Sequence, residues 1–139
     1  MPNEEDIQNR YMQFQMLQQQ IEQVSQHAEL LNQQNIELET SISALQEIEK
    51  IKINNEILAP IANGIFLKAE LKDNQRLIVN VGGEITVEKT FPEVVKLLEE
   101  QKEEVTAKVM EAEEVLQQLQ YQAMKIYEEV EKETKTEKP

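Results

Sequence analysis

The middle of the chain decides its fold, and residues 57–90 read ILAPIANGIFLKAELKDNQRLIVNVGGEITVEKT. Apolar and polar residues alternate in this segment, which is typical of short strands with one buried face. The alternation predicts strands at residues 57–61, 65–71, 77–81 and 85–89. The first of them is the weakest, because Pro60 restricts it to a sheet edge or a bulge.

Turn signals separate these strands. The polar run 72–76 predicts a turn after which the chain returns, and Gly82-Gly83 permits a second tight turn, so the segment makes two β-hairpins. A few short strands are marginal alone, so we expect the sheet to pack on a sheet from another chain. The residues assigned to this assembly sheet are Ile65, Leu67, Ala69, Leu71, Leu77, Val79, Val81, Ile85 and Val87.

Both flanks of this segment carry apolar residues at alternating steps of three and four, the pattern of a coiled-coil seam. On the first flank they are Ile7, Phe14, Leu17, Ile21, Val24, Ala28, Leu31, Leu38, Ile42 and Leu45. On the second they are Phe91, Val95, Leu98, Val105, Val109, Ala112, Leu116, Leu119, Ala123, Ile126 and Val130. The matching flanks predict an antiparallel coiled-coil hairpin within one chain. In the favoured register Phe14 faces Ile126 and Ala28 faces Ala112, because a slip by one heptad would bury Lys102.

The seam has polar interruptions. Asn35 occupies a core site, a polar substitution that fixes register at some cost in stability, and Arg10, Glu49 and Lys52 break the seam at its ends. The expected parts of this single unit are a first helix at 4–54, the hairpins at 57–90, a second helix at 91–132 and a disordered polar tail at 133–139.

Composition narrows the class of protein further. The chain has 139 residues but only 4% aromatic residues, too few to fill an ordinary globular core. Its net charge of −13 lies on the two flanks, and an acidic surface repels phosphate backbones, so no nucleic acid partner is expected. No run approaches the ~20 apolar residues of a membrane span, and the N-terminus does not resemble a signal peptide. The absence of cysteine is compatible with the cytoplasm, which is the expected location.

Residues that could support catalysis are sparse. The sequence contains no HExxH, CxxC, GxSxG or phosphate-binding loop. His27 is the only histidine and flanks the seam, where a solvated side chain is expected. Adjacent glutamates on a helix point ~100° apart, so they are read as solvated charges rather than paired acids and bases. We expect no enzymatic activity, no cofactor and no metal site.

Two stretches of the central segment resemble a known family. Residues 59–73 and 78–89 are similar to the first and second hairpins of archaeal-type prefoldin alpha-type subunits, and a phenylalanine then opens the returning helix. The resemblance spans residues 5–132. Alpha-type subunits carry two hairpins and beta-type subunits carry one. The resemblance implies an α+β fold, mainly α, in which a long antiparallel coiled-coil hairpin bears two short β-hairpins at one end that join an oligomeric β-barrel.

The resemblance also implies a function. It implies an ATP-independent co-chaperone, a hexamer of two alpha-type and four beta-type subunits, that captures unfolded proteins at the coiled-coil tips and delivers them to a group II chaperonin. The tip residues are then Tyr11, Met12, Phe14, Met16, Met124, Ile126, Tyr127 and Val130. Phe14, Ile126 and Val130 also belong to the seam, so ordinary packing is an alternative for them, whereas the other five are expected to be exposed. Two alternatives remain for the function: a filament-forming gamma-type prefoldin, and a passive coiled-coil scaffold that binds no client.

Overall fold

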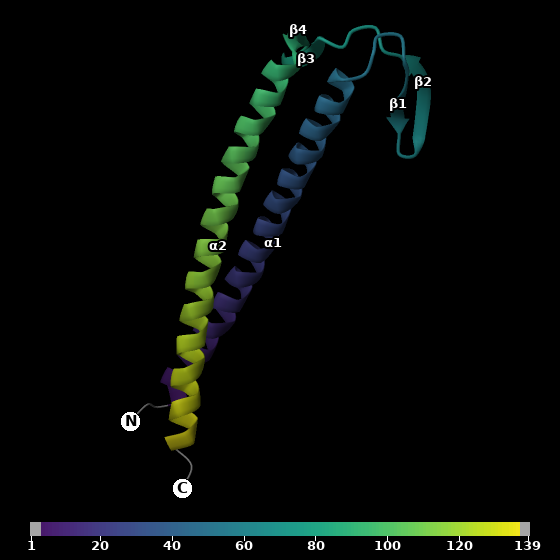
Figure 1. Cartoon of the computed structure of the whole chain (residues 1–139). Coiled ribbons are helices and arrows are strands. Elements are labelled where there is room, and N and C mark those ends of the chain that lie inside the picture. The colour runs from purple at the N-terminus through teal and green to yellow at the C-terminus, as the bar shows by residue number, and fades with distance from the viewer. Residues whose placement is uncertain (1–3, 137–139) are drawn as a thin grey trace. The chain divides into compact units, whose positions relative to one another are not determined.

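The computed structural model describes residues 4–136, with side chains described up to Glu133. Its elements in chain order are α1 (Glu4–Glu49), β1 (Glu56–Ala62), β2 (Ile65–Glu70), β3 (Arg76–Gly82), β4 (Ile85–Thr90) and α2 (Phe91–Thr136). Two long helices and two small antiparallel β-hairpins make up the fold (Figure 1). This is the predicted mainly α architecture. Within the described residues the strands form two separate two-stranded sheets and no closed barrel.

The described residues divide into two compact units, one of residues 4–34 and 105–136 and the other Asn35–Glu104. In the first unit the N-terminal part of α1 runs antiparallel to the C-terminal part of α2, and the ring centroids of Phe14 and Tyr127 lie 6.1 Å apart (Figure 1). In the second unit Lys102 Nζ lies 3.4 Å from Glu39 Oε2. Both contacts agree with the favoured register within their own unit and exclude the slip by one heptad.

The heptad seam forms as predicted. Every apolar seam position named from the sequence is buried or half-buried. The most fully buried are Ala28, Leu31, Ile42, Phe91, Val109, Ala112 and Ala123, at 1–9% exposure. Near the end of α1 the pattern shifts by one residue, because Ile48 is half-buried whereas Glu49 is exposed.

The first helix is shorter than the sequence predicts. It ends at Glu49 rather than at residue 54. The backbone N–H groups of Lys50 and Ile51 donate to carbonyls three residues earlier, at 3.2 and 3.0 Å, which tightens the chain into a turn. Asn54 then adopts a positive φ of 71°, and its N–H donates to the carbonyl of Leu71 at 2.7 Å. The segment thus bonds to the chain after β2 instead of extending the helix.

The hairpin turns differ from the prediction in one respect. β1 pairs with β2 and β3 with β4, through turns at Asn63-Gly64 and Gly83-Glu84. Gly64 and Gly83 have φ of 77° and 59°, a conformation that glycine adopts at low cost. Residues 72–76 are therefore a linker between hairpins, not a hairpin turn. In this linker the Asp73 carboxylate accepts the N–H groups of the second and third residues after it, at 2.8 and 3.2 Å.

The two hairpins have the same construction. The Ile57–Ala69 pair in the first hairpin corresponds to the Leu77–Lys89 pair in the second. The register of each pairing shifts near its turn, after Pro60 in the first hairpin and at the equivalent point in the second. The sequence allows Pro60 at a sheet edge or at a bulge, and the register shift lies next to it. The second hairpin has the same shift after Asn80, so the shift does not depend on a proline.

Each hairpin is anchored at its base by one apolar side chain. The residue that follows the first hairpin is Leu71, whose N–H donates to the Asn55 carbonyl at 3.0 Å. The residue that follows the second is Phe91, whose N–H donates to the Gln75 carbonyl at 3.2 Å. The side chains of Leu71 and Phe91 are 9% and 1% exposed. Leu71 was assigned to the assembly sheet, but it lies outside β2 and packs at the base instead.

The second helix begins with a side-chain cap and extends further than expected. Thr90 Oγ1 accepts the N–H of Glu93 at 3.3 Å, which satisfies one backbone donor of the first turn. The helix continues to Thr136, so a disordered tail from residue 133 was the wrong prediction for 133–136. Residues 137–139 of that tail lie outside the described residues.

A cross-link tests the helix pairing of the first unit. Cysteines placed at Ala28 and Ala112, which are both 8% exposed, are expected to form a disulfide within one chain on mild oxidation. The wild-type chain has no cysteine, so the bond is read directly as a mobility shift of the monomer on non-reducing gels. Disulfides that joined only separate chains would contradict an intramolecular pairing.

Candidate functional site

All residues assigned to the tips belong to the first unit, and we call them the end surface. Its members are Tyr11, Met12, Phe14, Met16, Met124, Ile126, Tyr127 and Val130. The five off the seam are exposed as predicted, at 57–63%. Phe14, Ile126 and Val130 are half-buried, since they also pack in the seam. In the part of the chain that the structure describes, these five side chains therefore keep more than half of their surface open to water.

A shallow groove belongs to the end surface. It measures about 280 Å³ and is lined by Met16, Leu17 and Ile126 together with three glutamines, Gln13, Gln20 and Gln122. Methionine adapts its shape to irregular apolar partners. The glutamine amides offer both donors and acceptors at the rim. This combination suits an apolar side chain and the polar backbone that carries it.

An ion pair closes the seam beyond the end surface. Arg10 Nη1 donates to Glu133 Oε1 and lies 3.8 Å from Glu129 Oε2. Arg10 and Glu133 both occupy seam positions, and their side chains are 35% and 18% exposed. Sequence reasoning missed Glu133 because it assigned this residue to the tail. Its spacing of three residues from Val130 was the available signal.

The hairpins present a second apolar surface, which we call the sheet surface. On one face Ala59 pairs with Leu67 in the first hairpin, and Val79 pairs with Val87 in the second. The assigned residues Ala69, Leu77, Val79 and Val87 are half-buried, whereas Ile65, Leu67, Val81 and Ile85 are 55–66% exposed. The opposite face also carries exposed apolar side chains, namely Leu58, Phe66 and Ile78, which the sequence reasoning did not assign.

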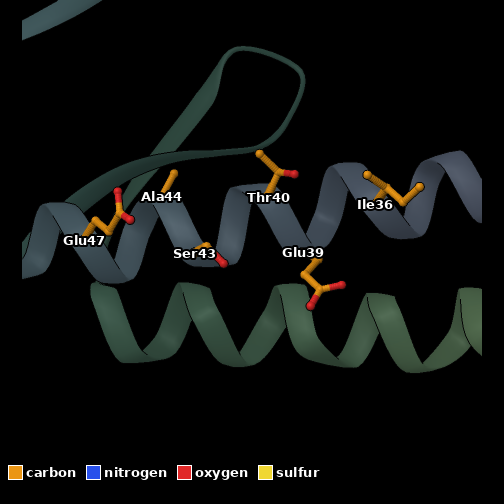
Figure 2. A pocket seen from close by; sticks show the side chains of 6 residues that line it. All are labelled: Ile36, Glu39, Thr40, Ser43, Ala44 and Glu47. Carbon is orange, nitrogen blue, oxygen red and sulfur yellow. The ribbon is translucent and has the colours of Figure 1, made fainter.

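A third concave feature lies along α1 in the second unit (Figure 2). It has a volume of about 420 Å³ and is lined by Ile36, Glu39, Thr40, Ser43, Ala44 and Glu47. In Figure 2 Thr40 and Ala44 point away from the neighbouring helix and Glu39 points towards it, in agreement with the Glu39–Lys102 ion pair. Most of the lining is polar, and one of its two glutamates, Glu39, is engaged by Lys102.

Among residues 4–136, no group of three or more His, Cys, Asp or Glu side chains is arranged to hold a metal ion. Over the same range, neither helix is long and apolar enough to cross a membrane.

Comparison with known proteins identifies the family of this chain. Residues 17–136 match the family model described as prefoldin subunit. The prefoldin subunit alpha of Methanococcus maripaludis strain C7 is 31% identical over 112 residues, which cover 76% of each chain. That of Pyrococcus horikoshii is 31% identical over 119 residues, 85% of this chain and 80% of the relative. The chain therefore belongs to the prefoldin family, a family of chaperone subunits.

A solved structure has the same fold. A filamentous PFD from Methanocaldococcus jannaschii, determined by cryo-EM, superposes with a TM-score of 0.72 over 83% of this chain and 95% of that chain. Its sequence identity is 17%, so this likeness concerns the fold alone. The arrangement of two long helices and two β-hairpins is thus one that prefoldin chains adopt.

Proposed function

We propose that this chain is the alpha-type subunit of an ATP-independent co-chaperone that captures unfolded proteins at its end surface and passes them to a group II chaperonin. The observation that carries the proposal is the exposure of Tyr11, Met12, Met16, Met124 and Tyr127 at 57–63% in a chain of the prefoldin family. A persistent apolar surface of this kind is normally covered by a binding partner. Methionine-rich surfaces bind many apolar partners without a strict sequence preference.

The sheet surface supports the assembly part of the proposal. Its partners are prefoldin beta-type subunits, four of them with two copies of this chain, joined through an oligomeric β-barrel. Isolated two-stranded hairpins are marginal in water, and here both of their faces carry apolar side chains such as Leu67 and Ile78. Pairing with strands of other subunits would cover these side chains and satisfy the edge backbone groups. We place this assembly in the cytoplasm, in keeping with the cysteine-free sequence.

Reconstitution tests the proposal. The purified chain is mixed with a beta-type prefoldin subunit, and the mass of the product is measured by light scattering. The complex is then added, without ATP, to a chemically denatured protein as it is diluted into buffer. A hexamer that suppresses the rise in turbidity is the expected result. A hexamer without suppression would favour a passive scaffold, and long polydisperse species formed by the chain alone would favour the filament type.

A further inference from the structure

The outer end of the seam is closed by charges where a coiled coil would normally place apolar residues. Arg10 stands between Ile7 and Phe14 in the heptad pattern of α1, and Glu133 follows Val130 in that of α2. All five of these side chains are half-buried. The layer beyond Phe14 is therefore an ion pair, with Glu129 as a second, more exposed carboxylate 3.8 Å from the arginine.

We propose that the Arg10–Glu133 pair is a clasp that holds the outer ends of α1 and α2 together, and that its opening releases the apolar seam residues behind it for unfolded chains. The residues behind the clasp are Phe14, Ile126 and Val130, which are half-buried while the ends are closed. The gating part of this inference rests on the proposed function, whereas the closure itself does not.

The strength of the pair suits a reversible closure. A part-exposed ion pair contributes little net stability, and salt weakens it further. An apolar pair at the same two positions would hold the ends at least as firmly and would not respond to salt. With charges at this layer, the closed and open conformations of the helix ends therefore differ little in free energy. Any client that binds only the open form then shifts the population towards it.

An aromatic contact lies behind the clasp and would be released when the helix ends separate. Phe14 and Tyr127 form a tilted ring pair with centroids 6.1 Å apart and planes at 40°. Beside it lies the groove lined by Met16, Leu17 and Ile126. Separation of the ends would expose the Phe14 ring, which is half-buried, and widen the apolar surface that starts at this groove. The clasp thus controls how much of the seam a client reaches.

Distance measurements in the full-length chain test the closure without any client. The wild-type chain has no cysteine, so spin labels can be attached at Gln8→Cys and Glu128→Cys, which are both exposed positions. Double electron–electron resonance between the two labels then measures the separation of the helix ends. Arg10→Glu puts three carboxylates together and is expected to reduce the closed population about fivefold at low salt. Arg10→Glu with Glu133→Arg is expected to restore it. Lys108→Glu, an exposed site with the same charge change, is the matched control.

Salt and client binding complete the test. The wild-type closed population should fall at about 1 M salt, where the Debye length is about 3 Å, while Arg10→Leu with Glu133→Leu should stay closed. The reconstituted complex carrying these two leucines should bind reduced, carboxyamidomethylated lysozyme about fivefold more weakly than the wild-type complex.

Equal distances between the spin labels in Arg10→Glu and Lys108→Glu would overturn the clasp. Undiminished lysozyme binding by the two-leucine complex would overturn the gating. If the wild-type complex bound no lysozyme, the proposed function would fall, and the distances would still decide the closure.

Discussion

Replacement of Val79 by aspartate is expected to abolish assembly with beta-type subunits while α1 and α2 stay folded. Val79 pairs with Val87 across the second hairpin and is half-buried. In an assembled barrel it would lose the rest of its exposure to water, and an unpaired carboxylate there costs about 3–5 kcal/mol. Leu67→Asp is expected to act in the same way on the first hairpin, because Leu67 occupies the position equivalent to Val87.

The control for Val79→Asp lies next to it in the strand. Asn80→Asp adds the same charge on the opposite face, and the aspartate still offers an acceptor to the N–H of Gly82, which the asparagine accepts at 3.0 Å. Light scattering of each mixture with the beta-type subunit measures assembly, and circular dichroism measures helix content. A complete hexamer formed by both Val79→Asp and Leu67→Asp would exclude a barrel built from this face.

The coiled-coil part of the fold was predictable because a heptad pattern carries its own register. Apolar residues every 3.5 positions determine which side chains are buried, and the polar Lys102 excluded the slipped pairing. Burial at Ala28, Ala112 and Ala123 follows directly from that pattern. Exposure of Met12 and Met16 followed equally, since both lie off the seam.

The ends of elements were less predictable because they depend on contacts distant in sequence. Residues 50–54 contain no helix breaker, yet α1 ends at Glu49. The carbonyl of Leu71, which takes up the Asn54 N–H, is the competing partner and is invisible in a local pattern. At the other terminus Glu133 is polar and suggested a tail, but Arg10 across the seam gives it a partner.

The pairing of strands was ambiguous for a local reason. The polar run 72–76 has the composition of a turn, and so do the two glycine-containing turns. The glycines decided the pairing because Gly64 and Gly83 adopt positive φ. This conformation allows each hairpin to close through a two-residue turn, the shortest connection between its strands. Leu71, the last apolar residue of the predicted strand, then became the buried anchor of a linker instead of a sheet residue.

Replacement of three exposed methionines by glutamine is expected to weaken capture of unfolded proteins about tenfold or more. The residues are Met12, Met16 and Met124, which are 60%, 60% and 63% exposed. Burial of one such side chain against a client contributes about 1.5–3 kcal/mol, and each 1.4 kcal/mol corresponds to about tenfold in affinity. Several weak contacts on different subunits add up through avidity, so partial loss on two subunits weakens binding without abolishing it.

The matched control for these substitutions is Met110→Gln, because Met110 is 65% exposed in the same unit but does not belong to the end surface. Glutamine and methionine have similar helix propensities, so neither variant is expected to lose helix content. Binding of a labelled, permanently unfolded protein to each reconstituted hexamer gives the affinities, and suppression of turbidity gives the activity. If the triple variant matched Met110→Gln in both measurements, capture would belong to the sheet surface or to the beta-type subunits, because solvent-exposed methionines gain free energy only where a client covers them.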